Sequence, residues 1–457
     1  MNNFKKIFNS AKLSTLLFYS SILTFIIAFN FAHNPPSGWY QQFLPDLSGR
    51  QISDVFFLDS LTGWAVTPYT HQNDTAFVLK TTNGGNNWLI QYLRIGDVGF
   101  EKIYFLNANT GFACGANDFD GFTGLSKSID GGSNWNSLNV PDPFAQFSDM
   151  SVLSEDTIWL VSTSSGGGVF RTTNGGVNWI QQAPAGDYPN KIYMYNSRIG
   201  FIGFNAGTPT TKKTTDGGFN WFTVSNEGFT DIHFVDSLTG WKCNVFTIKK
   251  TSNGGINWIS QSFPTGKNIL NGIRRFSILN KDTIWGVGGI KQLGIVNRGM
   301  IYRTTNGGNY WLYQVPDTSI NIPRYEYSNF VSALKGWSYG VLSGVHTLTG
   351  GDSTFYPMVN INQISIEVPI DFKLNQNYPN PFNPTTTISF KIKNSEVVKI
   401  KVYNIEGREI SIPVNEKLNP GEYQFLFDAG TLSSGVYFYS LIIDEEIMDT
   451  KKMILVR

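Results

Sequence analysis

An eight-residue motif recurs through most of this chain and constrains its fold more than any other feature. Its first copy reads TTNGGNNW at Thr81–Trp88, and a degenerate seventh copy, TLTGGDST, begins at Thr347. The intervening copies end at Trp135, Trp179, Trp221, Trp258 and Trp311. Repeats at a fixed interval indicate an architecture built from equivalent units, each of which buries its apolar face against its neighbours.

A second element precedes each copy: an apolar strand, a short turn, and an aromatic residue that opens another strand. The aromatic residues are spaced 40 to 52 residues apart, at Trp64, Phe112, Trp159, Phe201, Trp241, Trp285 and Trp337. A period of this length with four strands per repeat is typical of a β-propeller blade. The composition agrees with an all-β fold, because charged residues make up only 15% of the chain while aromatic residues reach 15% and glycines number 46.

The motif has the chemistry of a tight turn between the third and fourth strands of a blade. An Asn or Asp side chain accepts backbone N–H bonds, the glycine pair permits positive φ, and the Trp is expected to pack between blades. These residues therefore receive a structural assignment: Asn83, Trp88, Asp130, Trp135, Asn174, Trp179, Asp216, Trp221, Asn253, Trp258, Asn306 and Trp311.

These turns resemble the Asp-boxes, or BNR repeats, of sialidase-type propellers. Combined with elements such as TGWAV at 62–66 and its equivalents, they look most like the photosystem II stability and assembly factor family. The resemblance covers residues 39–355 and implies a seven-bladed propeller, which we place at residues 37–356. It does not imply a role in photosynthesis, because one fold serves many functions.

The ends of the repeat region predict how the ring closes. The segment SGWYQQF at 37–43 is similar to the strand that follows each turn motif, and the seventh motif has Thr354 where the others have Trp. We expect Trp39 to replace the missing Trp and the N-terminal strand to complete the last blade, which removes an open sheet edge.

The N-terminus has the pattern of a secretory signal peptide, which we place at residues 1–32. Three lysines precede an apolar stretch that begins at Leu13, and Ala28 and Ala32 offer cleavage positions. An uncleaved membrane anchor is the alternative for this stretch. After cleavage, no other segment is apolar enough to predict a transmembrane domain.

After a linker placed at residues 357–371, residues 372–457 predict a small Ig-like β-sandwich. Four ordered segments, NYPNPFNP, VYNIEGREI, LSSGVYFYSL and TKKMILVR, resemble the type IX secretion (Por) sorting domain. That resemblance implies that the type IX machinery is a partner and that the protein is secreted or attached to the outer-membrane surface. An ordinary Ig-like accessory domain is the alternative.

No catalytic residue stands out, and we expect neither a cofactor nor a metal ion. No sialidase-like RIP segment precedes the first motif, and no HExxH, Walker-type or CxxC pattern occurs. Asp118 and Asp120 lack the further ligands of a calcium loop.

The near-zero net charge of +1, without a basic stripe, argues against a nucleic-acid partner. Cys114 and Cys243 fall at equivalent strand positions three repeats apart, which favours buried free thiols over a disulfide.

Two functions therefore remain: a non-catalytic extracellular binding or scaffold protein, and a secreted glycoside hydrolase of the sialidase or xyloglucanase type. For the first, aromatic residues on the loops of one face are candidates for contact with an unknown extracellular glycan or protein. The candidate ligand-binding residues are Tyr69, Phe119, Phe122, Tyr188, Tyr325 and Tyr327.

Overall fold

The structure is a computed structural model that describes most of the chain from residue 38 to residue 456. The segments outside the described part are 1–37, 70–74, 96–98, 117–123, 141–145, 164–166, 183–188, 205–207, 262–268, 310, 318, 352–355, 358–361, 430–431, 445 and 457. The predicted signal peptide therefore lies outside the described residues. In the described part, no helix is long and apolar enough to span a membrane.

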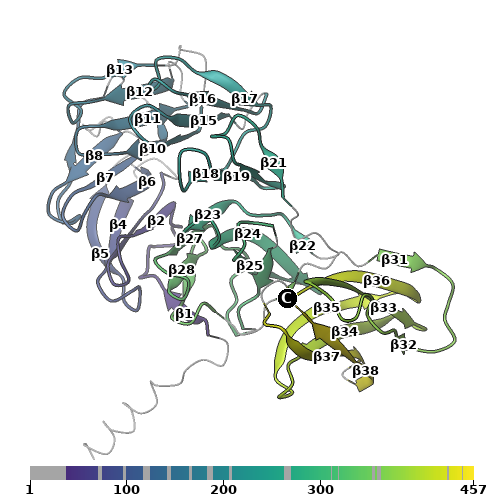
Figure 1. The fold of residues 1–457 in the computed structure, drawn as a ribbon. Helices are drawn as coiled ribbons and strands as arrows, with labels where there is room; N and C mark the ends of the chain where they lie inside the picture. Colours follow the sequence, from purple (N-terminus) through teal and green to yellow (C-terminus); the bar gives the residue numbers. More distant parts are fainter. Residues whose placement is uncertain are drawn as a thin grey trace, which may run out of the picture.

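Residues 38–357 form a ring of seven antiparallel sheets, which are the blades of a propeller (Figure 1). Blade 1 contains β2 (Asp54–Phe57), β3 (Gly63–Val66), β4 (Thr75–Thr81) and β5 (Leu89–Ile95). Blade 2 contains β6 (Gly99–Phe105), β7 (Gly111–Ala116), β8 (Leu125–Ser128) and β9 (Asn136–Ser137). Blade 3 contains β10 (Phe147–Val152), β11 (Ile158–Ser162), β12 (Gly168–Thr172) and β13 (Ile180–Gln181).

The remaining blades follow in sequence order. Blade 4 contains β14 (Lys191–Met194), β15 (Gly200–Phe204), β16 (Thr210–Thr214) and β17 (Phe222–Ser225). Blade 5 contains β18 (Asp231–Phe234), β19 (Gly240–Asn244), β20 (Thr247–Thr251) and β21 (Ile259–Ser260). Blade 6 contains β22 (Ile269–Leu270), β23 (Arg275–Ile278), β24 (Ile284–Leu293), β25 (Val296–Thr304), β26 (Leu312–Gln314) and β30 (Tyr356–Pro357). Blade 7 contains β27 (Tyr327–Phe330), β28 (Gly336–Tyr339), β29 (Ser343–Thr347) and β1 (Tyr40–Phe43).

The ring closes through the N-terminal strand, as the sequence predicts. β1 pairs with β29 over four residues, from Tyr40 opposite His346 to Phe43 opposite Ser343, and Trp39 is fully buried. In Figure 1 the purple β1 lies beside the green strands of blade 7. β30 instead extends the outer edge of blade 6, so the segment after the seventh motif does not fill the outer position of blade 7.

The motif turns share one hydrogen-bonding scheme that ties each turn to its own blade. In the first, the backbone N–H of Gly85 donates to Oγ1 of Thr81 at 2.8 Å, and Asn83 Oδ1 accepts the N–H of Asn87 at 2.9 Å. The N–H of Gly84 donates to the carbonyl of Leu61, in the turn that joins the first two strands of the blade. All seven blades repeat this last bond, so both kinds of turn lie on one face of the ring. The degenerate seventh motif keeps the glycine pair at positive φ.

The repeated Gly-aromatic element stacks one blade on the next. Trp337 of blade 7 stacks on Phe57 of blade 1, with ring centroids 4.0 Å apart. A Cβ on Gly63 would lie 2.7 Å from the ring of Phe57, so only glycine leaves room for that ring. The indole of Trp337 also donates to the carbonyl of Gly84 in the first motif of blade 1, at 2.7 Å. Blade 7 therefore holds the turn of its neighbour.

Among the described residues of the propeller, buried apolar side chains gather in seven clusters between successive blades, and one of these joins blade 7 to blade 1. The motif tryptophans differ in burial. Trp88, Trp135 and Trp311 are buried, whereas Trp179, Trp221 and Trp258 are half-buried at cluster edges. The depth at which these rings pack therefore varies along the chain.

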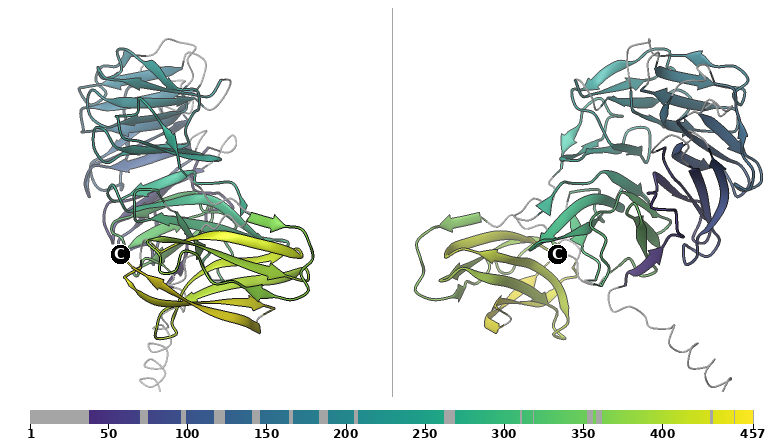
Figure 2. Two further views of the ribbon diagram at one scale, coloured as in Figure 1. Left: turned by 45° about the vertical axis from the view of Figure 1, so that its right-hand side comes forward. Right: turned by 180° about the vertical axis from the view of Figure 1, so that it is seen from behind.

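The C-terminal residues form a two-sheet sandwich, seen beside the propeller in Figure 2. One sheet contains β31 (Asn362–Ser365), β32 (Lys373–Leu374), β33 (Thr385–Ile392) and β36 (Gly421–Asp428). The other contains β34 (Glu396–Tyr403), β35 (Glu409–Leu418), β37 (Gly435–Ile443) and β38 (Glu446–Leu455). β31 lies inside the expected linker 357–371 and pairs with β36, so the sandwich begins nearer the propeller than the expected boundary at residue 372.

Candidate functional site

The innermost strands of the seven blades place one residue each at the same position around the central channel. That position lies three residues before the apolar residue that ends the strand. It is occupied by Asp54, Lys102, Asp149, Lys191, Asp231, Arg275 and Tyr327. Negative and positive side chains alternate around the propeller, and we call this set the charge ring. Its three Asp, two Lys and one Arg have a formal sum of zero.

Seven is an odd number, so strict alternation fails at one position, and Tyr327 occupies it. The guanidinium carbon of Arg275 lies 6.0 Å from the centroid of the Tyr327 ring. On its other side Tyr327 neighbours Asp54, and the hydroxyl of Tyr327 donates to the carbonyl of Ile52 at 3.3 Å. A neutral side chain at this position avoids placing two like charges side by side, which destabilises a folded chain.

The aspartates of the ring join neighbouring blades through the backbone. Oδ2 of Asp54 accepts the N–H of Ile103, and Oδ2 of Asp149 accepts the N–H of Ile192, both at 3.1 Å. Oδ2 of Asp231 accepts the N–H of Phe276 at 2.7 Å. In each case the donor belongs to the next blade and follows the cationic residue of the ring. These bonds satisfy backbone donors that the short innermost strands leave open.

Lys102 lies between two carboxylates at ion-pair distance, and Lys191 lies beside one. Nζ of Lys102 is 3.9 Å from Asp54 Oδ2 and 3.8 Å from Asp149 Oδ1, and Nζ of Lys191 is 4.0 Å from Asp149 Oδ2. Burial lowers the pKa of Lys102, but the flanking Asp54 and Asp149 outweigh it and raise that pKa. Burial, with Arg275 and Lys102 nearby, lowers the pKa of Lys191 to about 8 in spite of Asp149.

The other half of the ring is centred on Asp231. Its Oδ1 lies 3.3 Å from Nε2 of His233, two residues along the same strand. Burial would raise the pKa of Asp231, but the charge and hydrogen bond of His233, together with Arg275, lower it. Burial lowers the pKa of Arg275 less than the three aspartates raise it, so the guanidinium stays charged. Asp231 and Arg275 therefore stabilise each other in their charged forms.

A cavity of about 320 Å³ lies within the ring and is lined by residues of blades 2 to 6. Its charged walls are Lys102, Asp149, Lys191, Asp231 and Arg275. Tyr104, Ser151, Tyr193 and His233, two residues further along the innermost strands, line it as well. Glu101, beside the ring, is exposed, and its pKa is raised by desolvation and by Asp54 while Lys191 opposes the shift.

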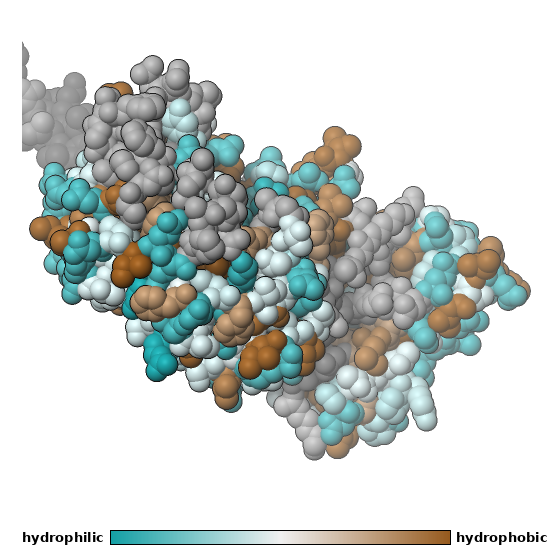
Figure 3. Space-filling view, turned by 90° about the horizontal axis from the view of Figure 1, so that it is seen from above, coloured by the Kyte–Doolittle hydropathy of each residue, from teal (hydrophilic) through white to brown (hydrophobic). Residues whose placement is uncertain are grey.

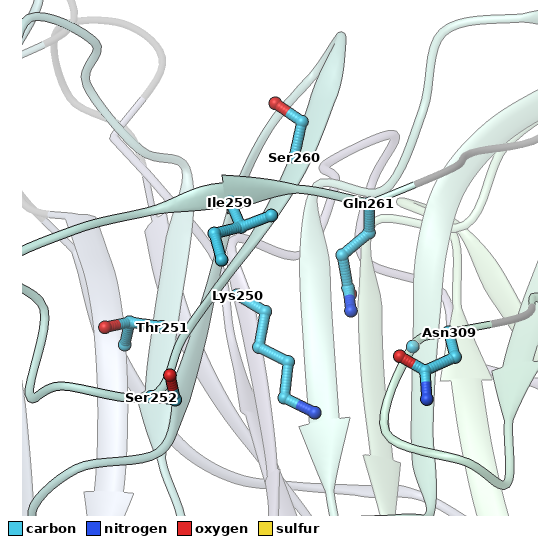
Figure 4. Close-up of a pocket in the computed structure, with 8 residues that line it drawn as sticks. Lys250, Thr251, Ser252, Ile259, Ser260, Gln261 and Asn309 are labelled. Carbon is cyan, nitrogen blue, oxygen red and sulfur yellow. The ribbon is translucent and has the colours of Figure 1, made fainter.

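A second cavity, of about 470 Å³, lies on the outer part of the propeller between blades 5 and 6. Lys250, Gln261 and Asn309 face it from the two sides (Figure 4). Nζ of Lys250 and Nε2 of Gln261 both donate at 3.1 Å to the carbonyl of Gly307 in the motif of blade 6. Other blades use the same kind of inter-blade contact, for example Lys80 to Gly131. The polar groups of this cavity therefore hold blades together.

The predicted ligand-binding aromatics do not form one site among the described residues. Tyr69 is half-buried beside Gly99, and Phe119, Phe122 and Tyr188 lie outside the described part. Tyr325 is 1% exposed and packs with Ile320 and Ile322, so it belongs to the core between blades 6 and 7 and not to the loop surface. Its segment folds back over Gly299, where a Cβ would lie 2.6 Å from the Tyr325 ring.

Tyr327 belongs to the charge ring, on the innermost strand of blade 7 and not on a loop. The charge ring as a whole was not predicted from the sequence. The signal was present, since each ring residue lies ten positions before the repeat aromatic of its blade. The ring residues vary in type, whereas the repeat is defined by residues that stay the same, so the repeat alone does not single them out.

The two cysteines of the propeller agree with the expectation from sequence. Cys114 and Cys243 are buried free thiols, and burial raises the pKa of both well above the usual value. Within the described ranges, no group of three or more His, Cys, Asp or Glu residues is arranged to hold a metal ion. Asp118 and Asp120 lie outside those ranges.

In Figure 3, hydrophilic and hydrophobic residues are interspersed over the described surface in view.

Comparison with known proteins gives a match in the C-terminal part and structural similarity in the propeller. Residues 376–456 match the family described as "Secretion system C-terminal sorting domain". No curated protein matches the chain significantly. A structure of YCF48 bound to D1 peptide has a TM-score of 0.51 and 19% identity, covering 70% of this chain and 98% of that one.

Two further structures extend the comparison. YCF48 from Cyanidioschyzon merolae has a TM-score of 0.50 and 17% identity, covering 68% of this chain and 98% of that one. The xyloglucanase of family GH74 from Xanthomonas campestris has a TM-score of 0.42 and 11% identity, covering 66% of this chain and 59% of that one. Identities this low establish the fold alone. The chain therefore combines a β-propeller similar in fold to YCF48 with a secretion system C-terminal sorting domain, which directs export by the type IX route to the cell surface or the medium.

Proposed function

We propose that this exported protein is a non-catalytic binding or scaffold propeller whose ligand or partner engages the central cavity. The observation that carries the proposal is that hydrogen bonds hold the ring carboxylates in fixed positions. All three accept a backbone N–H from the next blade, and Asp149 and Asp231 line the cavity next to cationic groups. Charged groups held in fixed positions in this way suit recognition of a charged ligand.

A glycoside hydrolase needs a different pair of carboxyl groups. One must remain protonated to act as an acid, and the other must be free to act as a base or nucleophile. Asp231 has a lowered pKa, and Asp54 and Asp149 are each buried and bonded to the backbone. None of the three suits either role. YCF48, a propeller of similar fold, has been solved with a bound peptide, so the fold serves binding in that protein.

One observation favours the second candidate, a secreted glycoside hydrolase. Glu101 is exposed and has a raised pKa, as a general acid requires. A candidate partner is Asp54, whose charge contributes to that shift. Asp54 is 6% exposed and its Oδ2 is engaged by Ile103, which leaves it poorly placed to attack a sugar or to activate water.

The two functions are separated by turnover. Purified protein from residue 33 onward is expected to release no product from sialosides, β-glucans or xyloglucan, and to bind its ligand without consuming it. If any product is released, a Glu101→Gln variant tests whether Glu101 is the general acid responsible. If the unmodified chain releases product and the Glu101→Gln variant does not, the protein is a hydrolase. Binding is then not its sole role.

A further inference from the structure

In the charge ring most hydrogen-bond acceptors are used within the protein, whereas the cationic donors are not. This difference indicates which kind of ligand the ring can bind. The carboxylates are largely used within the protein: Asp54, Asp149 and Asp231 each bind a backbone N–H of the next blade. Asp231 also accepts the N–H of Ile232 at 3.0 Å through its other oxygen. Most acceptors of the ring are therefore already occupied.

The cationic side chains of the ring, by contrast, donate no hydrogen bonds to the described part of the protein. The carboxylate oxygens nearest to the two lysine Nζ atoms lie at 3.8 to 4.0 Å, which exceeds the length of a hydrogen bond. Among the described residues, the side chains of Lys102, Lys191 and Arg275 form no hydrogen bond within 3.5 Å. Lys102 and Lys191 are 26% and 19% exposed, and all three residues line the cavity. The cavity thus presents three cationic donor groups.

One buried acceptor in the ring also lacks a hydrogen-bond donor within the described part of the chain. Oδ1 of Asp149 is buried and accepts no hydrogen bond there, and the Asp149 side chain is only 6% exposed. A buried carboxylate oxygen without a donor is costly, so a hydroxyl or N–H group supplied by a ligand would stabilise it. The cavity therefore suits a compact group that carries an anion beside a hydrogen-bond donor.

We propose that the central cavity binds a uronic acid, the charged sugar unit of acidic polysaccharides, with Lys102, Lys191 and Arg275 donating to its carboxylate. This inference rests on the proposed binding function. A uronic acid joins a carboxylate to a ring bearing hydroxyl groups, so one unit supplies both the anion and a donor for Asp149 Oδ1. The cavity of about 320 Å³ has room for a sugar unit, and Tyr104 and Tyr193 give it aromatic walls.

Titration of the purified chain from residue 33 onward tests this directly. Galacturonate and glucuronate are expected to bind saturably in calorimetry and to shift the NMR signals of channel residues, whereas galactose, the uncharged counterpart, binds at least about tenfold more weakly. Lys191→Gln is expected to weaken galacturonate binding about tenfold or more, through loss of a charge-assisted hydrogen bond. Lys127→Gln, which removes a surface lysine paired with Glu155, is the matched control.

A pH series adds a readout that a purely structural role would not move. The groups acting on Lys191 are Asp149, Arg275, Lys102, Asp231 and the nearby Glu101. Because the pKa of Lys191 is lowered to about 8, galacturonate binding weakens as the pH rises through that value and the ammonium loses its charge. Lys191→Arg keeps the charge, so binding in that variant should lose the step near pH 8.

Three results would overturn the inference. These are equal binding of galactose and galacturonate, absence of galacturonate and glucuronate binding at millimolar concentration, and binding of a short peptide with a free C-terminus in their place. The last result would leave the binding function intact and assign the cavity to a polypeptide. Hydrolysis of a glycan abolished in Glu101→Gln would instead reject the proposed function itself.

Discussion

The indole Nε1 of Trp39 donates a hydrogen bond of 2.9 Å to Oε1 of Gln314, across 275 residues of sequence. Trp39 precedes the first strand of the propeller, and Gln314 ends β26 of blade 6. The Trp39 ring also packs edge-on against Trp285 and Phe330, at centroid distances of 6.5 and 6.4 Å. A single residue at the N-terminal end of the propeller thus joins blades 6 and 7.

Trp39→Ala is therefore expected to destabilise the propeller by about 3–5 kcal/mol, the usual cost of removing a fully buried aromatic residue. Trp179→Ala is the matched control. Trp179 ends the third motif, the place that Trp39 takes for the seventh, but it is only half-buried, so its loss should cost clearly less. Urea denaturation followed by tryptophan fluorescence measures both. Equal costs for the two variants would show that closure by Trp39 contributes nothing beyond ordinary packing.

Gly63→Ala should destabilise the junction of blades 7 and 1 even though Gly63 has no left-handed backbone conformation. The new methyl group would lie 2.7 Å from the Phe57 ring, and that ring is also stacked against Trp337, which restricts its movement. We expect a loss of about 1–3 kcal/mol, typical of overpacking. Gly435→Ala, whose nearest contact would be at 3.8 Å, serves as the tolerated control in thermal melts.

The propeller should lose stability in acid through Asp231. Its pKa is lowered in the folded state, so the unfolded chain takes up the proton first, below the ordinary value of 3.8. The stabilisation is fully present above that value and is lost as the pH falls through the lower folded pKa. Asp231→Asn removes this dependence, so stability measured between about pH 5 and 2 should fall less steeply than in the unmodified protein, by about 1 kcal/mol or more.

Removal of residues 358–457 should leave a folded propeller that stays inside the outer membrane. The cut falls after β30, which belongs to blade 6, and it removes the whole sandwich including β31. The sandwich has its own buried core, which includes Ile388, Ile400 and Leu441. Cell fractionation and protease accessibility in intact cells measure the outcome. Surface exposure of the truncated chain at the normal level would contradict the sorting role of the domain.

Much of the architecture could be predicted from the sequence because the propeller is built from local repeats. The glycine pair and the Asn or Asp of each motif specify a turn within eight residues, and the repeat aromatic specifies a buried strand position. The closing role of Trp39 was predictable for the same reason, since the seventh motif lacks its Trp and the N-terminus supplies one. The buried free thiols of Cys114 and Cys243 follow from their place in the repeat.

The candidate site was decided by the tertiary structure. Asp54, Lys102 and Asp149 lie in three successive blades, far apart in the sequence, and nothing local relates their charges. Only the closed ring brings the innermost strands together, so that each carboxylate reaches the backbone of the next blade and Lys102 lies between two carboxylates. The burial of Tyr325 was likewise not predictable from the sequence, because a loop aromatic is buried or exposed according to which blades its segment folds against.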